Sequence, residues 1–199
     1  HKKNKKLSKN LKVNIINEYL DKKINNNSLI NRASINSKEI KKNNIFFGIK
    51  GKNFDGNKFA DEALKKKASI CILEKNYSKK NPRKIFVKDT LKTFSNLSCI
   101  IRRSLGIPIV AITGSAGKTS LKELIGQSLN TLIPTSYSKK SFNNQYGVPL
   151  SLFNIDIKHK IGVFEIGMDK KGEIQKLSNL IRPDIGVITN ISYAHIKNF

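Results

Sequence analysis

Hydrophobic and polar positions alternate along the first half of the chain in a way that predicts a small mixed α/β domain. Apolar residues recur with the spacing of amphipathic helices in several stretches, and short apolar runs bounded by polar turns predict strands between them. The helices are expected at residues 11–20, 59–67 and 90–105, and the strands at 28–35, 44–49, 68–73 and 85–87. Gly106 and Pro108 end the last of these helices.

From Pro108 onward the apolar runs become more continuous and are separated by helical patterns. Strands are expected at residues 109–113, 161–166 and 185–189, and helices at 118–130 and 173–181. Strands that are apolar on both faces and separated by helices are typical of a parallel, doubly wound sheet. We therefore predict an α/β chain with a basic leader at 1–10, a small N-terminal α/β domain at 11–106, and a partial doubly wound parallel-sheet domain at 107–199.

The apolar run at 109–113 breaks into Gly114-Ser115-Ala116-Gly117-Lys118-Thr119-Ser120, which has the features of a phosphate-binding loop. Two glycines allow the backbone to turn its N–H groups inward, and the following helix directs its positive N-terminal end to the same place. Lys118 supplies a point charge for the β- and γ-phosphates, and the Thr119 hydroxyl can bind Mg²⁺. The loop is a shortened variant, because Ile112 stands where the common pattern has glycine. Residues 114–120 are therefore predicted to bind ATP.

Polar candidates follow two further predicted strands, at the edge of the sheet where ligands of such folds bind. Glu165 ends an otherwise apolar strand, and burying its carboxylate unpaired would be costly, so Mg²⁺ is the expected partner. The alternative is a carboxylate that caps a turn or pairs with a lysine. Asn190 and His195 follow the last strand; His195 is either a packed residue or a ligand on the phosphate side.

A polar loop at residues 138–150 carries Ser141 and the paired amides of Asn143 and Asn144. Amide side chains offer donors and acceptors for a sugar or a phosphate, but pairs of Asn also simply form turns. The residues alone leave both interpretations open.

The net charge of +24 would ordinarily suggest a nucleic-acid or membrane-surface partner. Its make-up argues against one, because the basic residues are 33 Lys and only 5 Arg, scattered along a chain without Trp. A nucleic-acid interface would favour Arg forks and aromatic stacking platforms. No apolar run reaches the roughly eighteen residues of a membrane span. We therefore expect neither a nucleic acid nor a membrane as partner.

Cys71 and Cys99 both lie in apolar stretches, so we expect small buried side chains and a reducing cytosol. The chain starts at His1 and ends at Phe199, shortly after a motif, and we expect it to be a fragment of a longer protein.

Several segments together resemble the Mur ligases. They are residues 112–120, 140–150, 164–168 with 172–174, and 182–191 followed by Ala194-His195. The Ser-Phe-Asn-Asn-x-x-Gly-Val-Pro pattern from Ser141 and the Glu-x-Gly-Met pattern from Glu165 resemble the branch that adds D-alanyl-D-alanine to UDP-N-acetylmuramoyl-tripeptide. Residues 44–59 are similar to the uridine-nucleotide-binding domain of that branch.

The resemblance implies a bacterial, cytoplasmic, ATP- and Mg²⁺-dependent amide ligase of peptidoglycan precursor synthesis, whose substrates are UDP-N-acetylmuramoyl-tripeptide and D-alanyl-D-alanine. The terminal carboxylate of the tripeptide would be phosphorylated and the resulting acyl phosphate attacked by the amine. The roles implied are catalysis by Lys118, Glu165 and His195, metal binding by Thr119, Glu165 and His195, nucleotide binding by residues 114–120 and Asn190, and substrate binding by Ser37, Lys50, Gly51, Ser141, Asn143 and Asn144. We expect a monomer.

The chain departs from the family pattern at two places. Asn36-Ser37-Lys38 stands where the family usually shows Asp-Ser-Arg, and Asp169-Lys170 where Asn-His is more frequent. Family members also continue into a C-terminal domain, so the isolated 199 residues are expected to be inactive as a ligase. The alternatives are a related amino-acid ligase and a non-catalytic nucleotide-binding module.

Overall fold

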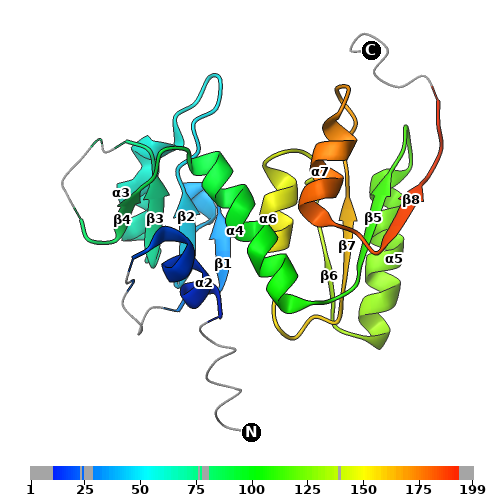
Figure 1. Ribbon diagram of the computed structural model, residues 1–199, viewed down its shortest axis with the longest axis horizontal. Coiled ribbons are helices and arrows are strands. Elements are labelled where there is room, and N and C mark those ends of the chain that lie inside the picture. Colours follow the sequence, from blue (N-terminus) through cyan, green and yellow to red (C-terminus); the bar gives the residue numbers. More distant parts are fainter. Residues whose placement is uncertain are drawn as a thin grey trace, which may run out of the picture. The chain divides into compact units, whose positions relative to one another are not determined.

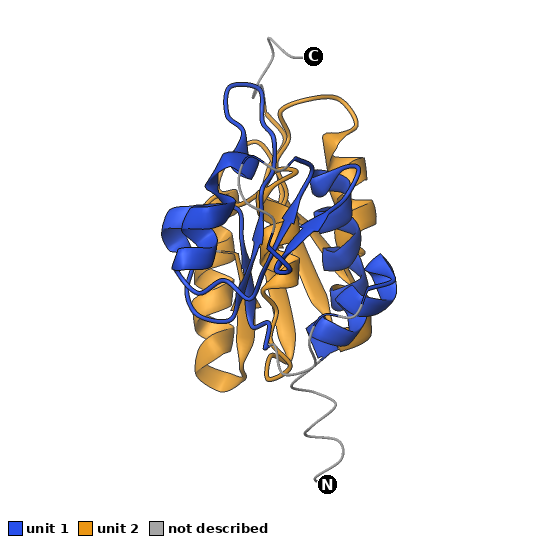
Figure 2. Cartoon of the chain, turned by 90° about the vertical axis from the view of Figure 1, so that its left-hand side faces the viewer, with its two compact units in different colours: residues 1–101 blue, residues 102–199 orange. Residues whose placement is uncertain are grey.

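The chain consists of two compact units, residues 1–101 and 102–199, which Figure 2 shows in different colours. The computed structural model describes residues 11–22, 24, 29–75, 77, 81–138 and 140–192. The division between the units falls within helix α4 (Thr90–Leu105), whereas the sequence pattern placed a boundary just after that helix. Each unit is built on its own four-stranded parallel sheet.

Unit 1 has the sheet order β1-β2-β3-β4, so each strand lies beside the next one in sequence (Figure 1). Its strands are β1 (Arg32–Ser34), β2 (Asn44–Phe47), β3 (Ile70–Leu73) and β4 (Lys84–Phe86). Its helices are α2 (Leu11–Leu20), α3 (Ala60–Lys65) and most of α4, with short 3₁₀ turns η1 (Ser37–Glu39) and η2 (Gly56–Phe59). The helices and strands occur where the apolar pattern predicted them, although β1 is shorter than the expected strand at 28–35, and the two 3₁₀ turns were not predicted.

The core of unit 1 forms because β2 and β3 are buried along their whole length. Phe46 pairs with Cys71 in the register of these strands, and Ala63 of α3 packs in the same cluster. Burial raises the pKa of the Cys71 thiol to about 12, which keeps it a neutral apolar group. The expectation of two buried cysteines is confirmed for Cys71, whereas Cys99 on α4 is only half-buried.

Unit 2 has the sheet order β6-β7-β5-β8, with β5 in an inner position. Its strands are β5 (Ile109–Thr113), β6 (Thr135–Tyr137), β7 (Ile161–Glu165) and β8 (Ile185–Ile188), and its helices are α5 (Lys118–Leu132), α6 (Gly147–Phe153) and α7 (Glu173–Ile181). The sequence pattern missed β6, which has few residues, and α6, which contains Pro149. That proline sits in the first turn of α6, where a helix needs no N–H donor.

Alternate residues of β5 bury on opposite faces of the sheet, as a doubly wound arrangement requires. Ile109 and Ala111 lie in a core cluster with residues of α6 and α7, while Val110 and Ile112 form a second cluster against α5. Figure 1 shows α5 separated from α6 and α7 by the strands of unit 2. The prediction of a doubly wound parallel sheet is therefore confirmed.

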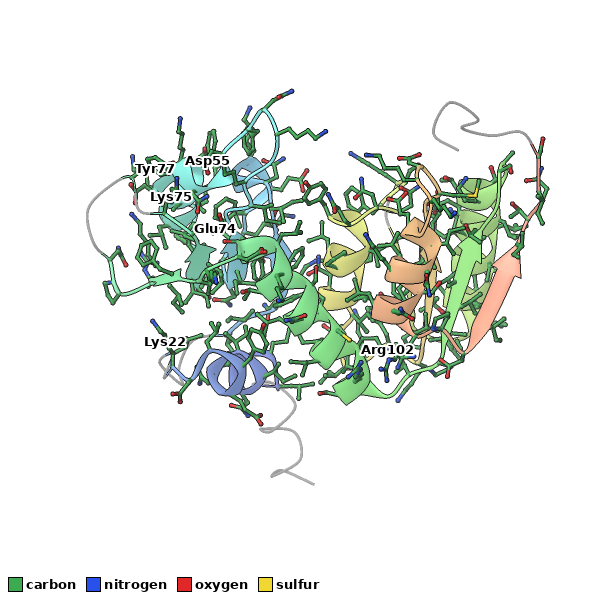
Figure 3. The ribbon with its side chains drawn as sticks, turned by 45° about the horizontal axis from the view of Figure 1, so that its top comes forward. Lys22, Asp55, Glu74, Lys75, Tyr77 and Arg102 are labelled. Carbon is green, nitrogen blue, oxygen red and sulfur yellow. The ribbon has the colours of Figure 1, made fainter. Side chains whose placement is uncertain are left out.

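Unit 2 begins at Arg102, near the end of α4 (Figure 3), and the Arg102 side chain is anchored in that unit. The buried guanidinium donates from Nε to the Ile181 carbonyl at 2.9 Å and from Nη2 to the Arg182 carbonyl at 3.0 Å. It also pairs with Asp184 at 3.1 Å. These bonds cap the last turn of α7 and fix the start of β8.

Strand β8 differs from the buried strand predicted for residues 185–189. Ile185 is 56% exposed and Ile188 is 63% exposed. The reason is position, since within the described residues β8 pairs with β5 alone and forms an edge of the sheet. Of its side chains, Val187 is partly buried against the α5 face. No helix in the described part of the chain combines the length and apolar character needed to cross a membrane.

Candidate nucleotide-binding site

The parallel register brings three loops of unit 2 to one edge of its sheet. Ile112 of β5 lies beside Glu165 of β7, and Thr113 lies beside Ile188 of β8. The Thr113 hydroxyl donates to the Ile166 carbonyl at 3.1 Å, and its carbonyl accepts from Thr189 N at 2.9 Å. The loop that follows Thr113 therefore starts between the ends of both neighbouring strands.

Glycine is required at the start of that loop. Gly114 has a φ of 132°, and a Cβ there would collide with the Thr189 hydroxyl and approach the Asn190 carbonyl at 3.0 Å. Gly117, with a φ of 77°, directly precedes the first residue of α5. Since α5 is a helix of 15 residues, its exposed first amides and its dipole favour an anion at this position.

The Lys118 side chain folds back over the loop. Its ammonium donates to the Gly114 carbonyl at 2.7 Å, and the side chain is only half-buried. A half-buried point charge of this kind, close to the first amides of α5, can transfer its contact from the carbonyl to a phosphate oxygen.

Asn190 shapes the loop from the end of β8. Its side-chain oxygen accepts from Ala116 N at 2.9 Å, and its carbonyl accepts from Ser115 N at 3.1 Å. The Ser115 hydroxyl exchanges two hydrogen bonds of 2.9 Å with the backbone of Ser192. Asn190, predicted to bind ATP, thus holds two of the loop amides in this structure rather than leaving them open.

Glu165 is the centre of a polar cluster beside the loop. Its side chain is 1% exposed, and its Oε2 accepts from the Thr119 hydroxyl at 2.8 Å. Its Oε1 accepts from Asn143 Nδ2 at 2.7 Å. The Ser141 hydroxyl lies 3.3 Å from that of Thr119. The sequence predicted that Thr119 and Glu165 lie at the same edge of the sheet, and the structure shows that they are in direct contact.

These oxygen donors fit Mg²⁺. A buried carboxylate and a hydroxyl at the end of a phosphate loop are the hard ligands this ion takes, with water and phosphate oxygens completing its shell. Among the described residues, no three His, Cys, Asp or Glu side chains gather into an all-protein metal site. The further ligand predicted from the sequence, His195, lies outside the described residues.

An open hollow lies next to the phosphate loop. It is lined by Ala116, Gly117, Ser120, Leu121, Leu124, Thr189 and Asn190. Leu124 is 65% exposed, so the hollow has an apolar wall on α5 and a polar one at the end of β8. Ser120, predicted to bind ATP, is exposed at this hollow.

Asn143 and Asn144 have different roles: Asn144 forms a turn, and Asn143 contacts the polar cluster at Glu165. Asn144 accepts from the backbone N–H groups of Tyr146 and Gly147, each at 3.0 Å, and so forms the turn that starts α6. Asn143 instead directs its side chain to Glu165 and accepts from Gly167 N through its carbonyl at 2.6 Å.

The candidates for the uridine end all lie in unit 1. Ser37 is buried, and its hydroxyl donates to Glu62 Oε2 at 3.0 Å. Hydrogen bonds from Lys66 and Ser37 lower the pKa of Glu62. Lys50 forms an isolated antiparallel bridge with Asp55, and Gly51 N donates to the Phe54 carbonyl at 2.7 Å. Lys50, Gly51 and Asp55 thus belong to one tight loop that follows β2.

Sequence reasoning missed a network around Asn57 in the same unit. Asp55 accepts from Asn57 Nδ2 at 2.6 Å and from the Tyr77 hydroxyl at 2.7 Å. The Asn57 side-chain oxygen accepts from the backbone N–H groups of Glu74 at 2.8 Å and Lys75 at 3.3 Å. Figure 3 shows Asp55, Glu74, Lys75 and Tyr77 gathered at one end of unit 1. The Asp-Gly-Asn turn was the signal that could have indicated it.

The network shifts two pKa values in opposite directions. Partial burial would raise the pKa of Asp55, but hydrogen bonds from Asn57 and Tyr77, together with the charge of Lys50, outweigh it and lower that pKa. The hydrogen bond to Asp55 raises the pKa of Tyr77, because losing the phenolic proton would place two negative charges together.

Known sequences match most of the chain. A family described as "Mur ligase family, catalytic domain" matches residues 29–124, and "Mur ligase middle domain" matches residues 112–199. The UDP-N-acetylmuramoyl-tripeptide–D-alanyl-D-alanine ligase of Buchnera aphidicola (subspecies Acyrthosiphon pisum) is 37% identical over 171 residues, covering 86% of this chain and 37% of that protein. The Escherichia coli protein of the same name is 33% identical over 155 residues, covering 78% of this chain and 34% of that protein.

Solved structures give the same result. MurF from Acinetobacter baumannii superposes with a TM-score of 0.81 at 27% identity, over 94% of this chain and 42% of that one. MurF ligase from Thermotoga maritima in complex with ADP superposes with a TM-score of 0.71 at 32% identity, over 83% of this chain and 38% of that one. The chain therefore spans well under half the length of these relatives. Both sequence and fold show that the chain belongs to the Mur ligase family.

Proposed function

We propose that the chain provides the phosphate-binding machinery of an ATP-dependent ligase that joins D-alanyl-D-alanine to UDP-N-acetylmuramoyl-tripeptide. The observation that carries the proposal is the buried Glu165 carboxylate, bonded to Thr119 at the start of the helix that follows the phosphate loop. The names of the curated relatives support the substrates, since they describe this ligation. A MurF structure in complex with ADP supports the nucleotide.

The reaction transfers the γ-phosphoryl group of ATP to the terminal carboxylate of the tripeptide, giving an acyl phosphate and ADP. The amine of D-alanyl-D-alanine then attacks the acyl carbon and gives up a proton as the C–N bond forms, and phosphate leaves with the electron pair of the broken C–O bond. No protein nucleophile is required. The need is to neutralise charge on the transferring group, which Lys118 and the amides at the start of α5 are placed to do.

Thr119 and Glu165 would hold Mg²⁺, with His195 as the further ligand proposed from the sequence. The ion would supply positive charge at the β- and γ-phosphates. Thr119 and Glu165 are already in contact, so they can bind the ion without a large rearrangement of unit 2. Asn143 orients the carboxylate by donating to its second oxygen.

Substrate recognition is proposed to involve both units. Ser141 and Asn143 are candidates for the muramoyl end because they adjoin Thr119 and Glu165. Ser37, Lys50 and Gly51 are candidates for the uridine end in the loops of unit 1. Asn144 is a candidate to donate to the substrate from its side-chain nitrogen, because its side-chain oxygen already accepts hydrogen bonds in the turn. We propose a monomeric enzyme of the bacterial cytoplasm.

A thermal-shift comparison on the 199-residue chain tests this proposal. Mg·ATP and UDP-N-acetylmuramoyl-tripeptide should each raise Tm, because a ligand that binds only the folded state stabilises it by mass action. Stabilisation by Mg·ATP alone would favour a nucleotide-binding module without the muramoyl substrate. Stabilisation by neither ligand would contradict the proposal.

A further inference from the structure

Lys122 is fully buried on α5, one helical turn after Lys118. Its ammonium donates to the Ser138 carbonyl at 2.6 Å and to the Lys140 carbonyl at 2.9 Å. It also pairs with Glu123 Oε1 at 2.6 Å. A buried ammonium is tolerated only when it is well paired, so the local fold around Lys122 depends on these contacts.

The carbonyls that Lys122 contacts belong to the segment that leads from β6 to the Glu165 cluster. Ser138 N still bonds to the Val163 carbonyl at 3.2 Å, so the segment leaves the sheet at Ser138. Lys140 has a φ of 52°, which turns the chain sharply. Ser141 follows immediately, and its hydroxyl faces that of Thr119.

The side chain of Ser138 does not hold this segment. Its hydroxyl is buried and has no hydrogen-bond partner within the described part of the chain. The segment is instead brought close to α5 at Gly126, where a Cβ would lie 2.5 Å from the Tyr137 ring. One turn earlier on the same helix, Lys122 reaches the two carbonyls just beyond Tyr137.

We propose that Lys122 is a positioning residue for the cation site. By tying the Ser138 and Lys140 carbonyls to α5, it sets Ser141 beside Thr119 and Asn143 against Glu165. Thr119 lies on α5 as well, so a single helix carries a proposed metal ligand and the anchor of the loop facing it. This inference rests on the proposed nucleotide-binding function.

Lys122→Met tests it on the 199-residue chain, because methionine keeps the apolar stem and removes the ammonium. ATP affinity is measured by calorimetry with Mg²⁺ and with EDTA. The affinity in EDTA should stay within about twofold of wild type, since the loop amides and Lys118 remain. The gain in affinity on adding Mg²⁺ should fall roughly tenfold, equivalent to about 1.4 kcal/mol. Ser138→Ala is the matched control and should leave both values unchanged.

A double-mutant cycle with Asn143→Ala distinguishes positioning from general damage. If Lys122 acts through the loop, the double variant should show the same Mg²⁺-dependent gain in ATP affinity as Asn143→Ala alone. The inference would be overturned if Lys122→Met lowered the ATP affinity equally in EDTA and in Mg²⁺, or if the effects of the two substitutions were fully additive. If circular dichroism shows that the Met variant does not fold, Lys122→Gln enters the same comparison under the same criteria, because its neutral side chain is one bond shorter than that of lysine and gives up the paired hold on the Ser138 and Lys140 carbonyls.

The outcomes separate the two proposals. A wild-type chain that binds no nucleotide overturns the proposed function, and this inference with it. A wild-type chain that binds nucleotide with a Mg²⁺-dependent gain that Lys122→Met leaves intact overturns this inference alone.

Discussion

The two units carry sheets of the same kind but use the carboxyl ends of their strands differently. In unit 2 the loop after β5 turns through glycines into the 15-residue helix α5, and it presents backbone amides and a lysine. In unit 1 the loop after β2 runs into η2, a 3₁₀ turn of 4 residues. There, Asp55 accepts hydrogen bonds from the backbone and side chain of Asn57, and Asn57 accepts one from the backbone of Glu74.

The difference indicates where each unit can bind charge. A long helix with exposed first amides stabilises an anion through its backbone and dipole, whereas a single 3₁₀ turn has little dipole to offer. The loop after β2 therefore lacks the helix dipole of the loop after β5, and its polar groups are instead fixed by the Asn57 network. Substitution of Lys118 should therefore alter phosphate binding, whereas substitutions that disturb Gly114 or the Asn57 network should alter stability.

Gly114→Ala should have the largest effect. The added Cβ would meet the Thr189 hydroxyl and the Asn190 carbonyl, and alanine is strained at a φ of 132°. We expect unfolding of unit 2 to become easier by about 3–5 kcal/mol, combining overpacking with backbone strain. Urea denaturation measures the change. Gly186→Ala is the control, because a Cβ there meets nothing within 4 Å, and an equal loss in both variants would contradict the argument.

Asn57→Ala should destabilise unit 1 by about 2–4 kcal/mol, because it leaves the N–H groups of Glu74 and Lys75 without their acceptor. Denaturant unfolding followed by circular dichroism gives the value. The exposed Asn53→Ala is the control. A loss below about 1 kcal/mol would show that unit 1 does not depend on this network.

Lys118→Ala should weaken Mg·ATP binding roughly 10- to 100-fold, since hydrogen bonds to charged groups contribute about 1.5–3 kcal/mol. Stability should change little, because the side chain is half-buried and contacts one carbonyl of the loop. Calorimetry measures the affinity, with the exposed Lys176→Ala as control. An unchanged affinity of Lys118→Ala for Mg·ATP would contradict the assignment of residues 114–120 as a phosphate-binding loop.

The smallest effect concerns the pH dependence of unit 1. The lowered pKa of Asp55 means that its stabilising contribution is present above its unfolded pKa of about 3.9 and is lost as pH falls through the folded value. The raised pKa of Tyr77 means that its contribution is lost as pH rises through a value above about 10. Tyr77→Phe should move the Asp55 pKa upward in an NMR titration of its carboxyl carbon. An unmoved Asp55 pKa would contradict the contact.

Local patterns explain what could be predicted from sequence. The glycine-containing loop between β5 and α5 was predictable because the strand, the glycines and the helix start are contiguous in the sequence. The placement of Thr119 and Glu165 at the same edge of the sheet followed from the rule that parallel strands end at one edge, whereas their direct contact is a finding of the structure. Both inferences needed only the chain order of neighbouring elements.

The rest depended on packing that a sequence does not display. Lys122 is one of 33 lysines, and nothing in its neighbours marks it as buried. The different roles of Asn143 and Asn144 depend on which backbone groups the turn before α6 brings near. The exposure of β8 depends on strand order, because the same apolar run would be buried in an inner position.

The edge strand β8 has a consequence for the behaviour of this chain in solution. Its exposed Ile185 and Ile188 lie on a strand that, within the described residues, is paired on one side, and such edges favour strand pairing between molecules. The net charge of +24 opposes that association by mutual repulsion. Salt reduces the screening length from about 30 Å at 0.01 M to about 3 Å at 1 M. Light scattering should therefore find the chain dispersed in dilute buffer and clustering as ionic strength rises.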